Sequence, residues 1–294
     1  MGFQESALSG AVEGRRPDKA RSDKVRTEPP RSDASTAAAA RTERLVARVP
    51  DPGRARVSVV VPTLNEERNI AWVLERMPAC VGEVVVVDGF STDRTLEVAR
   101  ATRPDVVIVN QRGQGKGAAL RTGFETATGD YIVAIDADGS MEPAEIEYYV
   151  AALDIGYDLV KGSRHLRASG SLDLTTVRRL GNSALVGAVN LMWGSQLSDL
   201  CYGFFGFRRT CLEQLALHSR GFEIETELAV HAIAANLRIA EVPSVELLRH
   251  HGQSHLSAWR DGWSIFRLLA RERLPVAQRP LVDALDRRGL ETVS

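Results

Sequence analysis

Short apolar runs alternate with helical patterns along the chain from Val57 onward. The runs are rich in β-branched residues and predict strands at residues 57–61, 83–87, 106–109, 131–135 and 159–161. Their nearly continuous apolar content is typical of strands that are buried on both faces. The intervening segments predict helices at residues 66–77, 93–102, 115–127 and 143–155. This alternation predicts an α/β fold with a mostly parallel central sheet flanked by helices.

The alternation ends near Lys161, and the second half of the chain has a mixed pattern. We expect helices at residues 176–193, 210–217, 225–235 and 257–273, and strands at residues 203–208 and 238–242. No internal repeat of about 20 to 50 residues is visible. We therefore expect one α/β domain over residues 57–256, followed by an amphipathic C-terminal helix and tail over residues 257–294.

Residues 1–56 differ in composition from the rest of the chain. They hold 12 Lys and Arg against 8 Asp and Glu, whereas residues 57–294 hold 25 against 30, which gives a net charge of −1 for the chain. Few large apolar side chains occur before residue 57, so this basic extension is predicted to be disordered. The near-neutral total argues against a protein whose whole surface binds nucleic acid.

The cysteines and the apolar runs exclude further classes of protein. Cys80, Cys201 and Cys211 are odd in number and widely spaced, which suggests neither a disulfide framework nor a zinc site. No apolar run approaches the roughly 18 to 20 residues that span a bilayer, and the first 20 residues do not resemble a signal peptide. We expect a cytoplasmic protein that can contact the inner membrane face peripherally.

The most informative polar segment is Asp136-Ala137-Asp138, directly after a predicted strand. Alternate residues of an extended segment point to the same side, so both carboxylates can face one point at the carboxyl edge of the sheet. Two hard anionic oxygens at this spacing suit Mg²⁺ or Mn²⁺ bound to a substrate diphosphate. A polar strand end that caps the next helix is the plain alternative.

Three more segments carry candidate chemistry at the same edge. They are Pro62-Thr63-Leu64-Asn65-Glu66-Glu67, Asp88-Gly89-Phe90-Ser91-Thr92-Asp93-Arg94-Thr95 and Arg112-Gly113-Gln114-Gly115-Lys116-Gly117. Asp88 can accept hydrogen bonds from a base or a ribose, although Ser, Thr and Asp runs are also ordinary helix caps. The backbone N–H groups of the glycine-rich helix start can hold an anion, and Lys116 adds a positive charge.

These segments, in this order and spacing, resemble family 2 glycosyltransferases with the GT-A fold, over about 200 residues from 57 to 256. The resemblance implies an inverting enzyme that uses a nucleotide-diphosphate sugar and Mg²⁺ or Mn²⁺. It implies a donor nucleotide site made of Pro62, Thr63, Glu66, Asp88, Lys116 and Asp136. Asp136 and Asp138 would meet the metal, and Asp138 is also assigned as catalytic. Gly89 departs from a common form of the pattern that has a second acid after Asp88.

The second half of the chain is similar to the polyprenyl- and dolichyl-phosphate hexose synthases, through Lys161-Gly162-Ser163-Arg164 and the segments that follow it. This likeness makes Arg164 and Arg178 the candidates for the acceptor phosphate. Asp199 takes the position of the acid closest to the acceptor: it would be the general base for a hydroxyl acceptor, whereas an ionised phosphate needs none. The run after Asp199 departs from the usual pattern. One histidine of residues 250–255 would complete the metal shell, and we select His251.

Two amphipathic segments bear on membrane contact, at residues 176–193 and 257–274, where Trp and Arg lie on different faces. Packing on the protein's own domain explains them equally well. The leading hypothesis is transfer of a hexose from UDP- or GDP-hexose to a polyprenyl phosphate at the membrane surface. Transfer to a soluble hydroxyl acceptor, such as a natural product or small sugar, is the alternative, and a non-catalytic nucleotide-sugar-binding protein is the third. The sequence does not predict the oligomeric state.

Overall fold

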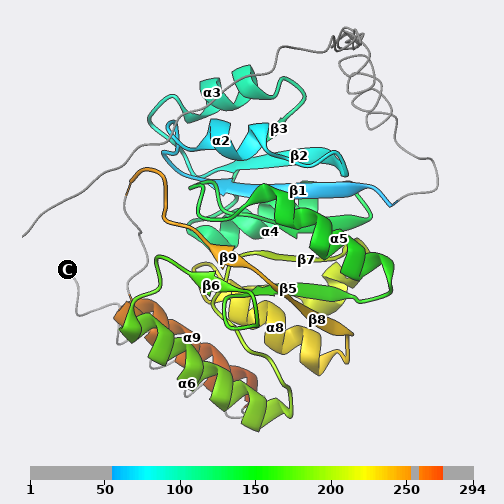
Figure 1. The fold of residues 1–294 in the computed structure, drawn as a ribbon, viewed down its shortest axis with the longest axis vertical. Coiled ribbons are helices and arrows are strands. Elements are labelled where there is room, and N and C mark those ends of the chain that lie inside the picture. The colour runs from blue at the N-terminus through cyan, green and yellow to red at the C-terminus, as the bar shows by residue number, and fades with distance from the viewer. Residues whose placement is uncertain (1–54, 253–257, 274–294) are drawn as a thin grey trace, which may run out of the picture. The chain divides into compact units, whose positions relative to one another are not determined.

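The computed structural model describes residues 55–252 and 258–273. Nearly all of the predicted basic extension, the loop at residues 253–257 and the tail from residue 274 lie outside the described residues. The centre of the fold is a sheet in the order β3-β2-β1-β4-β7-β5-β8 (Figure 1). Its strands are β1 (Val57–Thr63), β2 (Val81–Asp88), β3 (Val107–Asn110), β4 (Tyr131–Ala134), β5 (Leu159–Ser163), β7 (Phe205–Arg208) and β8 (Ile239–Pro243).

The sheet is mostly parallel, as the alternating pattern predicts. β1 pairs in parallel with β2 and β4, β2 with β3, and β5 with β8. β7 is antiparallel to both of its neighbours, β4 and β5. A strand from the mixed second half of the chain is thus inserted between two strands of the regular first half.

Helices cover both faces of the sheet, which explains the continuous apolar content of its strands. On one face α2 (Ile70–Glu75), α3 (Thr95–Thr102) and α5 (Ile146–Asp154) share a buried core with the strands. On the other face α4 (Lys116–Thr126), α7 (Leu212–Leu215) and α8 (Ile224–Ala234) form a second core. Gly123 of α4 packs on Val60 so closely that a Cβ atom there would overlap the valine, so this glycine sets the distance between helix and sheet.

A third apolar cluster lies beyond the β8 edge of the sheet. There α6 (Thr176–Trp193) packs with α9 (Ala258–Arg273), and both contribute residues to a cluster with α8 (Figure 1). In the described part of the chain, no helix combines the length and apolar character needed to cross a bilayer.

Some elements differ from their predicted bounds. The helix expected at residues 66–77 is limited to α2, because residues 65–67 are held in a turn by side chains of the 91–95 segment. The helices expected at residues 143–155 and 210–217 each begin with a 3₁₀ turn, at Pro143–Glu145 and Arg209–Cys211. The two-residue strands β6 (Gly170–Ser171) and β9 (Val245–Glu246) were not predicted. The helix at residues 176–193 matches α6 at both ends.

Candidate active site

The carboxyl ends of β1, β2 and β4 meet at one edge of the sheet. Thr63 ends β1 and is the register partner of Asp88 at the end of β2. On the other side of β1, Ile135 continues β4 by donating its N–H to Val60 O, and Asp136 follows directly. The predicted residues Thr63, Asp88 and Asp136 therefore lie at the same edge, where open α/β sheets bind ligands.

Asp136 shares a buried cation with a second acid. Lys116 Nζ lies 2.7 Å from Asp136 Oδ1 and 3.0 Å from Glu225 Oε1. Burial opposes the charge of Lys116, but the two carboxylates raise its pKa above the ordinary value. Burial also raises the pKa of Asp136 and of Glu225, against the opposing effect of Lys116. One ammonium group thus faces two carboxylates, and the triad is negative overall when both are ionised.

Gly203 packs directly against this triad. A Cβ atom at position 203 would lie 2.7 Å from Lys116 Nζ and 3.2 Å from both Asp136 Oδ2 and Glu225 Oε1. A real Cβ contact of 2.7 Å would force the lysine to move. A larger residue at this position would therefore have to displace the Lys116 ammonium group from its place between the two carboxylates.

Asp138 pairs with a different cation, Arg249. Arg249 Nη2 lies 2.7 Å from Asp138 Oδ2, and Arg249 Nη1 lies 3.4 Å from Glu66 Oε1. The same segment is tied to the turn by its backbone, because the N–H of His250 donates to Asp138 O at 3.2 Å. Burial raises the pKa of Glu66, while Asn69 and Arg249 oppose that rise. Arg249 thus joins two of the predicted site residues.

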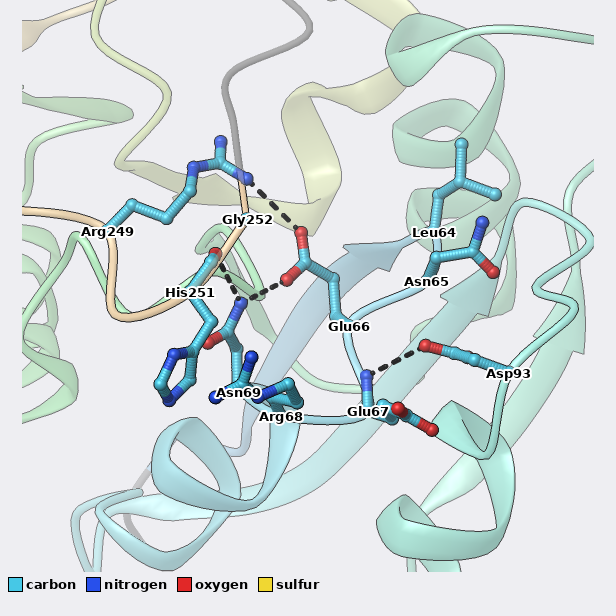
Figure 2. Close-up of a pocket in the computed structure, with 10 residues that line it drawn as sticks. All are labelled: Leu64, Asn65, Glu66, Glu67, Arg68, Asn69, Asp93, Arg249, His251 and Gly252. Atoms are coloured by element: carbon cyan, nitrogen blue, oxygen red, sulfur yellow. Dashed lines mark hydrogen bonds and ion pairs between the residues drawn. The ribbon is translucent and has the colours of Figure 1, made fainter.

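Asn69 ties the segment that carries Arg249 to the start of α2 (Figure 2). Its Nδ2 donates to Glu66 Oε2 at 2.5 Å and to His251 O at 3.1 Å. Its Oδ1 is buried and has no hydrogen-bond partner within the described residues. An acceptor in this position can be satisfied by a bound ligand. The pocket here has a volume of about 220 Å³ and is lined by Leu64, Asn65, Glu66, Glu67, Arg68, Asn69, Asp93, Arg249, His251 and Gly252.

The two histidines of this segment differ in their surroundings. His250 packs against Gly139, which directly follows Asp138, and the centroids of its ring and of the Trp72 ring lie 4.5 Å apart. The side chain of His251 is exposed and lines the pocket. The imidazole next to the D-x-D turn is therefore that of His250, and the metal role assigned to His251 stays a prediction.

The residues that are predicted to bind the nucleoside also make hydrogen bonds that stabilise the edge of the sheet. The Asp88 carboxylate accepts the backbone N–H of Ser91 at 3.1 and 3.3 Å, and Thr63 Oγ1 donates to Val61 O at 3.0 Å. Asp88 and Thr63 are buried, and Pro62 is half-buried. Each carboxylate oxygen keeps a further lone pair, so Asp88 can still accept a hydrogen bond from a ligand.

The glycine-rich start of α4 has a structural task that the sequence did not reveal. The N–H groups of Gly117 and Ala118 donate to Arg220 O at 2.8 and 3.3 Å. A Cβ atom at Gly117 would lie 2.5 Å from Ser219 O. These two N–H groups are therefore not free to hold an anion, so the expectation is wrong for them. Lys116 remains the cationic group of this segment.

The candidate acceptor residues Arg164 and Asp199 form a buried, bidentate ion pair. Arg164 Nε lies 2.8 Å from Asp199 Oδ2, and its Nη2 lies 3.0 Å from Oδ1. Arg164 Nη1 also reaches Glu246 Oε2 at 3.2 Å. Burial alone would raise the pKa of Asp199, but the hydrogen bonds and charge of Arg164 hold it below its ordinary value. The fold thus brings together two of the predicted site residues, but their polar groups are already bound to each other.

Arg178 lies in the first turn of α6. Its backbone N–H donates to Thr175 Oγ1, the cap of that helix, and its Nη1 lies 3.6 Å from Asp173 Oδ2. Its side chain is partly exposed. The role of Arg178 toward an acceptor stays a prediction.

The carboxylate ligands at this edge suit a magnesium or manganese ion whose coordination is completed by substrate. Within the described residues, no three His, Cys, Asp or Glu side chains are grouped to hold a metal by themselves. Mg²⁺ is commonly bound by one or two carboxylates together with substrate phosphates and water. Asp136 and Asp138, two hard oxygen donors at the sheet edge, fit that pattern, whereas a closed all-protein site would not.

Three side chains of the site were missed at the sequence level: Asn69, Glu225 and Arg249. Arg249 directly precedes the histidines of residues 250–255, and Glu225 lies in an acidic segment, Glu223-Ile224-Glu225-Thr226-Glu227. Their partners are far away in the sequence, so only the fold could identify them. Asn69 carried no separate signal.

Comparison with known proteins identifies the family. The model described as "Glycosyl transferase family 2" matches residues 58–216, more than half of the chain. The chain belongs to glycosyl transferase family 2. Glycosyltransferase AglJ of Haloferax volcanii is 33% identical over 218 residues, 73% of this chain and 71% of that protein. The dolichol-phosphate mannosyltransferase of Pyrococcus furiosus is 31% identical over 223 residues, 73% of this chain but only 62% of that protein.

Solved structures confirm a GT-A-like fold for this family 2 enzyme. Glucosyl-3-phosphoglycerate synthase from Mycobacterium tuberculosis in complex with Mg²⁺ and UDP has a TM-score of 0.61 and 25% identity, covering 80% of this chain and 84% of that one. The same enzyme with Mn²⁺, UDP and phosphoglyceric acid has a TM-score of 0.61 and 26% identity, covering 78% and 81%. The predicted fold class and the prediction of a family 2 glycosyltransferase are thereby confirmed.

Proposed function

We propose that the protein transfers a hexose, with inversion, from a uridine or guanosine diphosphate sugar to a polyprenyl phosphate at a membrane surface. The observation that carries this proposal is the paired acids Asp136 and Asp138 at the carboxyl edge of the sheet, each held by its own cation. Solved relatives hold UDP with Mg²⁺ or Mn²⁺. Relatives in sequence are named as a dolichol-phosphate mannosyltransferase and as undecaprenyl-phosphate sugar transferases.

The donor diphosphate is proposed to bind between the two acids and the two cations. Asp136 and Asp138 would hold a divalent cation, which neutralises the charge that develops on the leaving diphosphate. Arg249 can then turn from Asp138 and Glu66 to the phosphate oxygens, because a guanidinium group suits phosphate as well as carboxylate. Lys116 would keep Asp136 oriented and add positive charge. Thr63 and Asp88 would face the nucleoside.

A phosphate acceptor fits the state of Asp199 better than a hydroxyl acceptor does. Both oxygens of its carboxylate are bound by Arg164, and its side chain is fully buried. Its lowered pKa makes it a weak proton acceptor. A hydroxyl nucleophile needs a base, but a phosphate is already ionised at neutral pH. This arrangement supports an acceptor that brings its own negative oxygen.

The paired helices α6 and α9 support membrane contact. On α6, Val177, Leu180 and Leu191 are exposed, and Leu191 is 87% exposed. On α9, Trp263 and Phe266 are more than half exposed and stacked, with ring centroids 5.4 Å apart. Arginines accompany these apolar side chains on both helices, at positions 178, 179, 260, 267 and 271. Exposed aromatic and aliphatic side chains next to arginine suit the interface of an anionic membrane.

A soluble acceptor is the second candidate. It is favoured by the solved relative that holds phosphoglyceric acid and is 26% identical to this chain. In that case the product stays in water, and the exposed apolar side chains of α6 and α9 have a role other than membrane contact.

Matched acceptors separate these possibilities. Purified protein is incubated with labelled UDP- or GDP-hexose, Mn²⁺ and one of three acceptors: a polyprenyl phosphate, the polyprenol without phosphate, or 3-phosphoglycerate. We expect labelled product with the polyprenyl phosphate and none with the polyprenol, since the nucleophile is the phosphate oxygen. Product with the polyprenol would contradict the interpretation that Asp199 does not act as a general base. Product with 3-phosphoglycerate alone would replace the lipid acceptor by the soluble one.

A further inference from the structure

The backbone from Ser198 to Cys201 is held by three side chains from separate elements, of which Lys161 and Asn182 are buried and Glu241 is half-buried. Glu241 of β8 accepts the N–H of Ser198 at 2.9 Å and that of Asp199 at 3.1 Å. Asn182 of α6 accepts the N–H of both Leu200 and Cys201 through its Oδ1, each at 3.2 Å. Lys161 of β5 donates to Leu200 O at 3.4 Å. We call Lys161, Asn182 and Glu241 the backbone cradle.

Lys161 is the unusual member of the cradle. It has no solvent exposure, and its Nζ lies 5.9 Å from the centre of the Phe205 ring. In the described part of the chain, no carboxylate lies within 4.0 Å of this ammonium group; Asp199, Glu225 and Glu241 act on it from farther away. Burial of a charge without a close partner is unfavourable, and an apolar residue of similar volume is often more stable. Burial accordingly lowers the pKa of Lys161.

The held segment lies between the two halves of the proposed site. At its start, Asp199 makes the bidentate pair with Arg164. Just beyond its end, Gly203 packs against the triad of Lys116, Asp136 and Glu225. A shift of Ser198–Cys201 would therefore move the acid on the acceptor side, while Gly203 lies beyond the segment that the cradle holds.

We propose that Lys161, Asn182 and Glu241 are positioning residues that fix the Ser198–Cys201 backbone and so place Asp199, which in turn orients Arg164, the candidate for the acceptor phosphate. None of the three needs to touch substrate. The placement of Asp199 toward an acceptor rests on the proposed function, but the hold on the backbone does not. Lys161 is the member whose replacement separates function from stability, because its charge does not contribute to a close ion pair.

The first test measures the backbone without substrate. In Lys161→Met, hydrogen–deuterium exchange of the amides of Ser198–Cys201 should become about tenfold faster than in the wild type, while exchange in β1 stays unchanged. Lys161→Gln keeps a side-chain donor, so its exchange rates should lie between those of Lys161→Met and the wild type. The matched control is Leu159→Val, a smaller apolar residue on the same strand and also fully buried, which should leave these amides protected.

The second test measures catalysis. With a polyprenyl phosphate acceptor, Lys161→Met should lower kcat by about 10- to 100-fold, because a displaced Asp199 no longer orients Arg164 and small displacements of substrate-positioning groups have effects of this size. The dissociation constant for the nucleoside diphosphate with Mn²⁺ should change by less than about twofold, since the donor pocket does not include Lys161. The thermal midpoint should stay equal to that of the wild type or rise.

The outcomes are distinct. The proposal would be overturned if the amides of Ser198–Cys201 exchanged at the wild-type rate in Lys161→Met. It would also be overturned if this variant kept the kcat and the acceptor KM of the wild type. Equal loosening of β1 and of this segment, in Lys161→Met and in Lys161→Gln alike, would show a general loss of stability and also overturn it. If the wild type transfers sugar to no acceptor, the proposed function fails, and the exchange measurement still decides whether the cradle holds the backbone.

Discussion

At the scale of single residues, the sequence identified most of the acids of the site but not their partners. The spacing of Asp136 and Asp138 predicts two carboxylates at one sheet edge, and both lie there. The structure adds that they are held by different cations, Lys116 and Arg249. Spacing rules apply within one element, whereas a partner from the far end of the chain depends on the complete fold. The pairing of Asp138 with Arg249 was for this reason not predictable.

The Arg164–Asp199 pair makes stability depend on pH. The folded-state pKa of Asp199 is lowered, so the stabilisation is fully present above the ordinary carboxyl value of about 3.9 and is lost as the pH falls through the lower folded-state value. At pH 7, Asp199→Asn should cost about 3 kcal/mol of unfolding free energy, because Arg164 keeps only Glu246. The difference from the wild type should shrink below about pH 4. Urea titrations at several pH values measure this, and a pH-independent difference would contradict the pair.

Gly203 offers a second test at this scale. Gly203→Ala should weaken binding of the nucleoside diphosphate with Mn²⁺ by about tenfold, because the new Cβ displaces Lys116 from Asp136 and costs a charged hydrogen bond. Calorimetry measures this affinity. Gly187→Ala is the matched control: no atom lies within 4 Å of its added Cβ, so it should leave affinity unchanged and stabilise α6 by up to about 1 kcal/mol. Equal affinities for both variants would refute the steric argument.

At the scale of elements, the apolar pattern located the long helices and the buried strands well. The long helix at residues 176–193 coincides with α6, which has a Thr175 cap and is followed by Gly194 in the left-handed conformation. Short elements were harder to predict. β6 and β9 have two residues each, too few to show alternation, and α2 begins only at Ile70 because the preceding turn is fixed by long-range side-chain bonds. Local pattern fixes the type of an element, but tertiary contacts set its ends.

The exposed face of α6 gives a prediction for the proposed membrane contact. Leu191→Glu should reduce binding to vesicles that contain anionic lipid by about tenfold, because it replaces an exposed apolar side chain by a charge that the surface repels. Flotation with the vesicles measures the bound fraction. Ile155→Glu is the control, since Ile155 is 73% exposed but lies next to α5. Equal vesicle binding by both variants and the wild type would contradict contact through α6.

At the scale of the whole molecule, the proposed site draws on three groups of residues from different parts of the chain. The first half supplies the acids at the sheet edge, β5 and the segment after α6 supply Arg164 and Asp199, and the segment after β9 returns Arg249 to Asp138. The alternation of strands and helices predicted the first group, and the resemblance to known glycosyltransferases predicted the second. The return of Arg249 depends on the path of the chain after β8, which the local pattern does not contain.

The most direct test of the central claim follows the sugar itself. Wild-type protein is incubated with labelled nucleotide-diphosphate hexose, polyprenyl phosphate in vesicles and Mn²⁺, and the label is partitioned between water and organic solvent. We expect label in the organic phase, its loss when the metal is chelated, and a decrease of at least about 100-fold in Asp138→Asn with the fold intact. Undiminished transfer by Asp138→Asn, or by the wild type without any divalent cation, would contradict the account.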